Sequence, residues 1–227
     1  MSRLALLALA VALAAPTSAR GDDAALAAEA AAFLSEYIRI DTTNPPGNEI
    51  AAAHFLAERF RAAGIEAQVF ESESGRGSVL ARLPGRGTAK PIVLLNHLDV
   101  VAADAARWRH PPFAGTVADG YVHGRGAVDC KGVAVTEALA MIELARRGVT
   151  LDRDVLFLGT ADEETGGAHG AGWFVEHHLD ALGGAALVLN EGGFIRNENG
   201  KRVYEVSVVE KTPLWLRLTA TGTAGHG

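Results

Sequence analysis

An apolar run that ends in two adjacent carboxylates decides the fold of this chain: Val155-Leu156-Phe157-Leu158-Gly159-Thr160-Ala161-Asp162-Glu163-Glu164-Thr165-Gly166-Gly167. A short, continuous apolar run bounded by turn residues is typical of a strand that is covered on both faces. Glu163 and Glu164 then stand at the carboxyl end of that strand, where one carboxylate can bind a metal ion and the other can move a proton. The stretch therefore predicts a buried strand that carries part of a metal-assisted hydrolytic site.

Strands and helices alternate along the chain outward from this strand. Helices are predicted at 22–39, 49–63, 132–147 and 170–179, and strands at 65–71, 78–83, 92–96, 155–160 and 186–190, with a long polar loop after 96. This alternation favours an α/β fold with a mostly parallel sheet flanked by helices. Near the C-terminus, residues 203–209 and the positions Leu214, Leu216 and Leu218 alternate apolar with polar side chains, which predicts half-buried strands.

Composition narrows the class of protein. The chain has 227 residues, of which 48% are hydrophobic and 21% are charged, enough for one full core and part of a second domain. The formal net charge is -6 and no basic block is interleaved with aromatic residues, so no nucleic-acid partner is expected. Cys130 is the only cysteine, which excludes a disulfide within the chain.

Residues 1–19 have the pattern of a secretory signal peptide. Arg3 supplies the positive start, residues 4–15 form an apolar run, and Thr17-Ser18-Ala19 is a small-residue cleavage site. The apolar run is too short to favour a membrane span. We therefore expect a secreted or periplasmic protein with no membrane span after the signal is removed. The alternative is that these residues belong to a buried Ala-rich helix.

Polar side chains gather where the predicted strands end. In an open α/β sheet, sites form outside the carboxyl ends of the strands, so we expect four distant segments to meet at one edge. The side chains are His97 and Asp99 after 92–96, Asp129 just before 132–147, Glu163 and Glu164 after 155–160, and Glu191 after 186–190.

The types of side chain in this set suit zinc. Imidazole nitrogen and carboxylate oxygen both bind it, and no thiolate is required. Asp129, Glu164 and Glu191 bring negative charges that repel one another without a cation. Two divalent ions and a bridging hydroxide balance those charges. We therefore expect two divalent metal ions with Asp129 as the bridge, most simply zinc, with cobalt or manganese as alternatives.

Asp99 and Glu163 have separate roles in this hypothesis. Asp99 stands two residues after His97, where it can hold the second imidazole nitrogen and fix the tautomer. Glu163 is then free to act as the general base, which takes a proton from the attacking water and passes it to the leaving amine. Cys130 is interpreted as a packed neutral thiol rather than a ligand, and Lys131 as a residue that orders the Asp129 loop.

Each site residue also has an interpretation without function. Taken alone, His97 is an ordinary histidine at a strand end and Asp129 is a charge at a helix N-terminus. Glu163 and Glu164 alone make a solvated turn, and Glu191 alone is a loop charge. The functional interpretation rests on the coincidence of all four segments.

Four segments give the chain a resemblance to the M20 metallopeptidases, a family that includes aminoacylases, carboxypeptidases, acetylornithine deacetylase and succinyl-diaminopimelate desuccinylase. In the family's order they are Asn96-His97-Leu98-Asp99-Val100-Val101, Gly124-Arg125-Gly126-Ala127-Val128-Asp129-Cys130-Lys131-Gly132, Asp162-Glu163-Glu164-Thr165-Gly166-Gly167 and Asn190-Glu191-Gly192-Gly193. Residues 41–47 and 108–113 are also similar, and the resemblance runs from about residue 31 to the end. It implies that His97 and Glu191 bind one metal ion, Glu164 binds the second and Asp129 bridges them. It also implies that Glu163 is the general base and that Asp99 supports His97.

The resemblance also implies a catalytic domain interrupted by a lid domain that often mediates dimerisation. Residues 20–210 then form the N-terminal part of the catalytic domain, and 211–227 begin the lid. The segment 221–227 resembles the part of the lid whose histidine, here His226, reaches the partner subunit's active site and stabilises the oxyanion. A homodimer through the lid is expected for a longer version. Because the family's second histidine ligand and carboxylate-binding residues are missing, the chain alone is expected to bind metal weakly and to lack turnover.

The function that follows is that of a metal-dependent exopeptidase or N-acyl-amino-acid amidohydrolase, which cleaves an amide bond near a free α-carboxylate. The segment 190–193 and the predicted strand with Trp215 favour the carboxypeptidase and aminoacylase branch. One alternative is a truncated, inactive homologue. Another is a nucleotide-binding α/β module with a phosphate at Gly124-Arg125-Gly126. Asp129 argues against that module, because it stands where the dinucleotide fingerprint has its third glycine.

Overall fold

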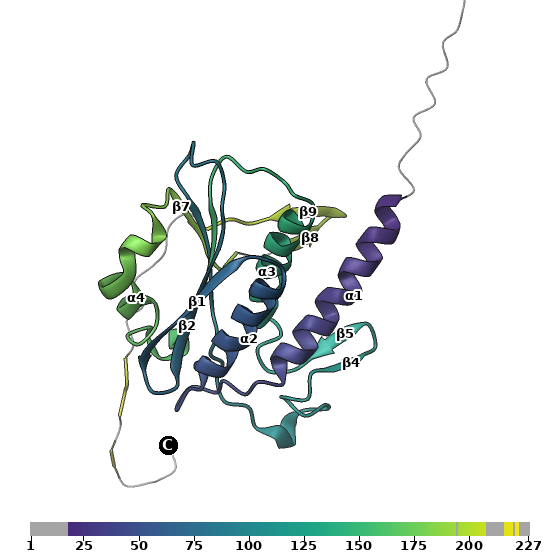
Figure 1. The fold of residues 1–227 in the computed structure, drawn as a ribbon. Coiled ribbons are helices and arrows are strands. Elements are labelled where there is room, and N and C mark those ends of the chain that lie inside the picture. The colour runs from purple at the N-terminus through teal and green to yellow at the C-terminus, as the bar shows by residue number, and fades with distance from the viewer. Residues whose placement is uncertain (1–17, 194, 208–215, 220, 223–227) are drawn as a thin grey trace, which may run out of the picture. The chain divides into compact units, whose positions relative to one another are not determined.

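The computed structural model describes residues 18–193, 195–207, 216–219 and 221–222 (Figure 1). Most of the predicted signal peptide, Trp215 and His226 lie outside these residues, so the predictions about them stay predictions. The chain divides into two compact units, one up to Glu191 and the other from Gly192 onward. Among the helices of the described residues, none has the length and apolar character that a membrane crossing needs.

Within the described residues of the first unit, five strands form the main sheet in the order β1-β2-β6-β3-β7. β3 pairs in parallel with β6 and β7, whereas β1–β2 and β2–β6 are antiparallel. The α/β fold is confirmed, and its sheet is mixed because the short turn Ser74-Gly75 between β1 and β2 can only reverse the chain. The bounds are β1 (Glu66–Glu73), β2 (Arg76–Leu83), β3 (Ile92–His97), β6 (Val155–Thr160) and β7 (Leu187–Leu189).

Helices cover both faces of this sheet. Helices α1, α2 and α3 lie on one face and α4 lies on the other (Figure 1). Three 3-10 turns of the described chain accompany them. The bounds are α1 (Ser18–Ile38), α2 (Glu49–Ala62), η1 (Ala105–Arg107), α3 (Lys131–Arg146), η2 (Glu163–Thr165), α4 (Ala171–His178) and η3 (Leu179–Leu182).

Strand β6 builds the core because all of its residues are buried. Successive side chains on a strand point to opposite faces. Val155 and Phe157 therefore join the cluster under α1, α2 and α3, while Leu156 and Leu158 join the cluster under α4. The Phe157 ring packs 4.9 Å from the ring of Phe60 on α2, measured between centroids. Burial of a side chain this large stabilises the fold by roughly 1.5–3 kcal/mol.

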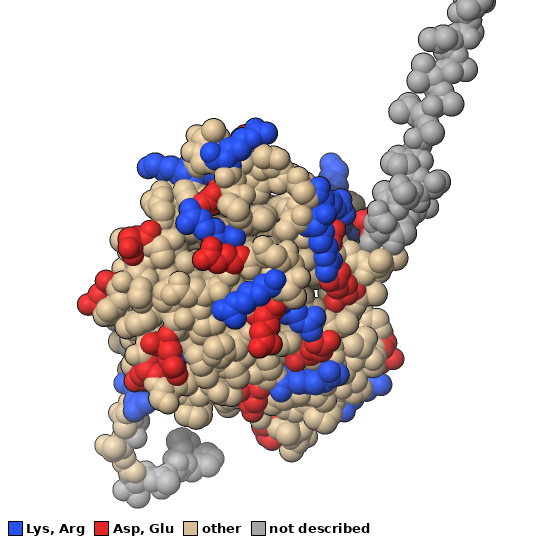
Figure 2. Space-filling model, viewed as in Figure 1, with Lys and Arg blue, Asp and Glu red and all other residues tan. Residues whose placement is uncertain are grey.

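Charged side chains lie on the surface of the helical layer. On the face shown in Figure 2, acidic and basic side chains are interspersed. Some of them link helices: Arg59 of α2 pairs with Glu36 of α1, and Arg146 of α3 lies 2.8 Å from Glu29 of α1. Exposed pairs of this kind contribute little stability each, so the apolar clusters carry most of the packing energy.

Two hairpins were not predicted from the sequence. One is β4 (Thr116–Ala118) with β5 (Tyr121–His123), in the expected polar loop; the other is β8 (Ile195–Glu198) with β9 (Lys201–Tyr204), in the second unit. Their turns are Asp119-Gly120 and Asn199-Gly200, with φ of 52°, 80°, 53° and 78°. Asp-Gly and Asn-Gly are the pairs that tolerate two positive φ angles in a tight hairpin. That signal was present in the sequence.

The predicted strands near the C-terminus are mostly wrong over the described residues. The strand predicted at 203–209 is found only at its start, because β9 ends at Tyr204 and residues 205–207 form no strand. Residues 216–219 also form no strand, and Leu216 and Leu218 are 75% and 95% exposed rather than half-buried. Alternation alone does not specify a strand, because packing against neighbouring strands supplies most of its stability. Leu214 lies outside the described residues.

Candidate metal centre

The carboxyl ends of β3 and β6 lie side by side at the candidate site. His97 is the last residue of β3, and its register partner on β6 is Thr160. The backbone N–H of Leu98 donates to the Thr160 carbonyl at 2.8 Å, which keeps the two chains together beyond the strands. Glu163 and Glu164 follow within one short turn. The parallel register thus brings His97 and the two glutamates to the same edge of the sheet.

Asp129 and Glu191 approach the same imidazole from two other segments. Asp129 lies just before α3, and its Oδ1 is 2.9 Å from His97 Nε2. Glu191 follows β7, and its Oε1 is 3.4 Å from the same nitrogen. Glu163 Oε2 lies 3.9 Å away from it. The structure therefore gathers around His97 all the candidate residues that it describes.

Two overlapping groups of side chains have the chemistry of a metal site. His97, Asp129 and Glu164 form one, and His97, Cys130 and Glu191 form the other; within each, the candidate ligand atoms lie within 4.8 Å of one another. Imidazole nitrogen with carboxylate oxygen is a donor set that divalent zinc favours. The residues present thus fit a divalent cation, and the second group adds a thiol that the prediction placed outside the ligand set.

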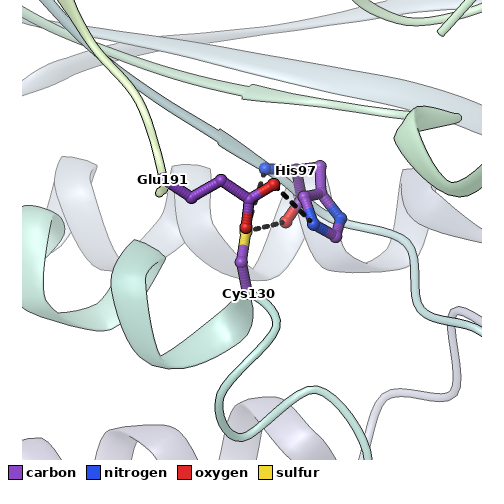
Figure 3. Close-up of side chains that lie close together, drawn as sticks. All are labelled: His97, Cys130 and Glu191. Atoms are coloured by element: carbon purple, nitrogen blue, oxygen red, sulfur yellow. Dashed lines mark hydrogen bonds and ion pairs between the residues drawn. The ribbon is translucent and has the colours of Figure 1, made fainter. Parts of the chain in front are cut away.

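The Cys130 thiol lies against the backbone of His97. Its Sγ accepts from the His97 backbone N–H at 3.2 Å and lies 3.4 Å from the His97 carbonyl, to which the thiol donates. Figure 3 shows the thiol, the Glu191 carboxylate and the His97 ring close together. Cys130 is fully buried. Contact with the strand end accounts for its place, as expected of a packed thiol, yet this place also puts sulfur within reach of the metal-binding group.

Asp99 contacts His97, as expected, and also both glutamates of the turn. His97 Nδ1 lies 3.0 Å from the backbone oxygen of Asp99 and 3.4 Å from its carboxylate. If Nδ1 holds the proton, Nε2, which faces Asp129, is free to bind a metal ion. The Asp99 carboxylate also accepts from the backbone N–H groups of Glu163 at 3.1 Å and Glu164 at 3.0 Å. Asp99 therefore joins the histidine to both glutamates.

The pKa shifts reflect acids crowded round one imidazole. Burial raises the pKa values of Glu163 and Glu164, and nearby carboxylates raise them further while His97 lowers them. The hydrogen bond with His97 lowers the pKa of Glu191 against the effect of burial. For His97 itself burial lowers the pKa, but hydrogen bonds with Asp99, Cys130 and Glu191 outweigh burial and raise it. Such a cluster favours a bound positive charge.

A cavity of about 260 Å³ lies beside these residues. His97 and Glu163 line it from the candidate centre, with Asn96, Thr160 and Asn190 at the strand ends and Gly166 in the turn. A cavity with convergent polar groups is the usual form of a small-molecule site. Its walls thus place the carboxylate of Glu163 where a small ligand can reach it.

Sequence reasoning missed several buried residues behind the centre. Asn44 and Arg76 contact Asp99 or Asp162, and Glu49 lies 3.4 Å from the Arg76 guanidinium. For Asn44, the similarity of segment 41–47 to the family was a usable signal. For Arg76 and Glu49 there was none, since charged residues at the start of a strand and of a helix are normally exposed.

Comparisons with known proteins find several relatives of this chain. The family described as Peptidase family M20/M25/M40 matches residues 93–220. Aminoacylase-1 from Sus scrofa is 36% identical over 197 residues, which cover 86% of this chain and 47% of that protein. Succinyl-diaminopimelate desuccinylase from Methylobacterium nodulans is 44% identical over 138 residues, or 59% of this chain and 34% of that protein. The chain spans about half the length of the aminoacylases it matches.

Solved structures show the same fold. Human carnosine dipeptidase 1 superposes with a TM-score of 0.68 at 21% sequence identity, over 77% of this chain and 41% of that chain. The M20 family metallo-carboxypeptidase Sso-CP2 from Sulfolobus solfataricus gives 0.62 at 26% identity, over 71% and 37%. The structural similarity thus extends over more than two thirds of this chain.

Proposed function

The chain belongs to peptidase family M20/M25/M40, and from that membership and the geometry of its site we propose that it hydrolyses an amide bond with the help of two divalent metal ions. One observation carries the proposal. His97, Asp129 and Glu164 come from three distant segments, yet their ligand atoms lie within 4.8 Å of one another. The carboxylates around the buried His97 imidazole repel one another, and a bound cation removes that repulsion.

His97 and Glu191 would hold one ion and Glu164 the other, with Asp129 between the two. Zinc is the first choice for this donor set, and cobalt and manganese are the alternatives. When bound, such ions polarise a substrate carbonyl and lower the pKa of water to roughly 7. A protein in the family whose solved structure is named a dinuclear metal binding peptidase supports the number of ions.

Glu163 would serve as the general base. Its carboxylate lines the cavity beside His97, and its side chain is about half exposed, so it can meet both water and substrate. Burial raises its pKa, which makes its carboxylate a stronger base than an ordinary glutamate. Glu163 takes a proton from the water as the new C–O bond forms. It then delivers that proton to the amine nitrogen as the C–N bond breaks.

The substrate class is a small peptide or an N-acyl amino acid. The relatives are named as an aminoacylase, a desuccinylase, a carboxypeptidase and dipeptidases, and these names support that class. The cavity of about 260 Å³ lies just below the range of about 300–1,000 Å³ that is usual for small-molecule sites, which favours a small substrate. Recognition of a free α-carboxylate, a homodimer through a lid that begins at 211–227, and a role for His226 on the oxyanion belong to the same proposal.

Export to the periplasm or the medium is part of the proposal, on the strength of the predicted signal at 1–19. The two alternative functions are less well supported. An inactive homologue is not favoured, because the candidate ligands are present and lie together. A phosphate-binding loop is not favoured either, because Asp129 would repel a phosphate and lies against His97 instead.

Metal binding tests the proposal directly. The purified chain is dialysed against zinc, and the bound metal is measured by atomic emission spectroscopy. We expect up to two zinc ions per chain, and a loss of at least one in His97→Ala. His54→Ala is the matched control, because His54 is an exposed histidine on α2. Equal zinc content in the wild type and His97→Ala would overturn the proposal.

A further inference from the structure

We propose that Asn44 and Arg76 are positioning residues of the metal centre, which hold the turn that presents Glu163 and Glu164. The inference rests on the proposed function and deepens it. It also assigns a role to segment 41–47, which resembles the family although none of its residues is among the candidate ligands. Neither residue belongs to the groups that could hold a metal ion.

The turn after β6 depends on buried partners for its shape. Asp162 adopts a left-handed conformation, with φ of 69°, and the 3-10 turn η2 follows at once. An L-residue in this region is held there by its surroundings. The N–H groups of Glu163 and Glu164 both donate to the Asp99 carboxylate. The position of Asp99 relative to Asp162 therefore decides where the two glutamates stand.

Asn44 links those two aspartates. Its Nδ2 donates to Asp99 Oδ2 at 2.8 Å, and it also lies 3.2 Å from Asp162 Oδ1 and 3.0 Å from Thr165 Oγ1. The Asn44 side chain therefore contacts both ends of the turn, Asp162 and Thr165, and also the Asp99 carboxylate. Asn44 is almost fully buried. A buried amide that serves three partners leaves little freedom in the turn.

The backbone of Asn44 is anchored just beyond His97. The N–H of Asn44 donates to the Val100 carbonyl at 2.9 Å, and the N–H of Val100 donates to the Thr42 carbonyl at 3.1 Å. Thr43 and Val100 form a parallel bridge. Segment 41–47 thus pairs alongside the residues that follow β3, and this pairing places Asn44 next to the turn after β6.

Arg76 fixes the direction of the Asn44 amide. Its Nη1 donates to Asn44 Oδ1 at 2.9 Å and to the Pro46 carbonyl at 2.8 Å, and its Nη2 donates to Asp162. Because Oδ1 of Asn44 accepts from the guanidinium, its Nδ2 must face the acids. The Arg76 side chain is 6% exposed, so solvent does not replace these bonds. A planar guanidinium can satisfy several acceptors at once, which a lysine cannot.

The hydrogen-bond network around Asn44 and Arg76 holds more buried acids than cations. Asp99, Asp162 and Glu49 are buried acids, and among the described residues Arg76 is the cation that pairs with Asp162 and Glu49. A buried acid that loses its cation must find another partner or move toward water. Loss of Arg76 or Asn44 therefore shifts the turn that carries Glu164. Neither makes a hydrogen bond or ion pair with Asp129 or Glu191.

Asn44 and Arg76 thus contact the turn that carries Glu164 but not Asp129 or Glu191, and this difference allows a test that separates a positioning role from a purely structural one. Structural damage weakens both metal-binding steps together, whereas displacement of Glu164 weakens one step more than the other. The variants are Asn44→Ala, Arg76→Met and Arg76→Lys. Arg82→Met is the matched control, because Arg82 lies on the same strand β2 and pairs with Asp154 away from the candidate ligands.

Cobalt(II) titration by calorimetry measures the two steps, and circular dichroism of the metal-free chains checks the fold. We expect Asn44→Ala to weaken one step by about 10–100-fold and the other by less than about threefold. Arg76→Met should do the same, Arg76→Lys should recover part of the loss, and Arg82→Met should change neither step. If Arg76→Met does not fold, Asn44→Ala decides, because it leaves the ion pair of Arg76 with Asp162 in place.

Unchanged affinities in Asn44→Ala, or equal weakening of both steps, would overturn the inference while the metal centre stands. A wild-type chain that binds no cobalt refutes the metal centre itself, and the inference falls with it. The two failures are therefore distinguishable from the wild-type titration alone.

Discussion

Nε2 of His97 lies 2.9 Å from Oδ1 of Asp129, although 32 residues separate the two along the chain. His97 ends strand β3 and Asp129 precedes helix α3. The two residues belong to different elements, so local structure does not bring them together. Their contact exists because the strand end and the loop before the helix meet at the edge of the sheet, where open α/β folds place their ligands.

Replacement of Glu163 by glutamine should separate catalysis from metal binding. Gln keeps the size of the side chain but cannot accept a proton, so in a longer version that includes the lid we expect turnover of an N-acyl amino acid or dipeptide to fall by about 10²–10⁴-fold. Zinc content should stay within error of the wild type. The control is Glu176→Gln, an exposed glutamate on α4. Hydrolysis at the wild-type rate in Glu163→Gln would contradict the assigned role.

Removal of metal should lower the thermal stability of the chain. An ion that binds only the folded state stabilises it by about 2.7 kcal/mol at a free concentration one hundred times its Kd. For a chain of this size each kcal/mol shifts Tm by about 2–4 °C. We therefore expect a chelator to lower Tm by several degrees in the wild type and far less in His97→Ala. Equal shifts in both, measured by scanning calorimetry, would argue against binding at His97.

Glu137 should make the stability of the fold depend on pH. Burial raises its pKa to about 7, although a hydrogen bond from Asn96 Nδ2 at 2.7 Å opposes that rise. Because the folded-state pKa lies above the unfolded value of 4.5, this contribution to stability is fully present below 4.5 and is lost as the pH rises through 7. Above pH 7 the loss is on the order of 3 kcal/mol at most.

Glu137→Gln removes that titration and keeps an oxygen for Asn96. The free energy of unfolding in urea, measured from pH 4 to 8, should fall less steeply with pH in the variant than in the wild type. The control is Glu58→Gln, on the exposed side of α2. Parallel curves for Glu137→Gln and the wild type would show that the Glu137 carboxylate is not buried in solution.

Truncation of Phe157 should destabilise the whole sheet. Its ring is fully buried and packs against Phe60, so Phe157→Ala leaves a cavity between β6 and α2. We expect a loss of about 3–5 kcal/mol in the free energy of unfolding. Tyr121→Ala, at an aromatic residue that is 70% exposed, is the control and should cost far less. A loss below about 1 kcal/mol in Phe157→Ala would contradict this account of the core.

Much of the fold could be predicted because its signals are local. The apolar run Val155–Thr160 needs no partner to be recognised as a buried strand, and the structure has β6 at those bounds. The Asp119-Gly120 turn also has a local signal, since Asp-Gly is a pair that tolerates two positive φ angles in a tight hairpin. The strand predicted over Leu216 and Leu218 is absent among residues 216–219, since its formation depends on neighbouring strands that the pattern of one segment cannot reveal.

Side-chain types at the strand ends were readable from the sequence, and so was their meeting at one edge. The hydrogen bonds behind them were not. The sequence suggested that the Asp99 carboxylate holds His97, whereas the Asp99 carbonyl lies closer to Nδ1 and the carboxylate accepts from the amides of Glu163 and Glu164. These partners depend on the register of β3 against β6 and on the shape of one turn.

The sequence by itself determined which chemical groups this protein brings to its sheet edge: an imidazole and several carboxylates, each at the end of a segment whose structure is set locally. Tertiary structure alone decided that Asn44 and Arg76 stand behind them. The physical reason is that a strand's side chains follow a period of two, which a sequence displays. Contacts between distant segments depend instead on angles and distances that hold only when the whole core is packed.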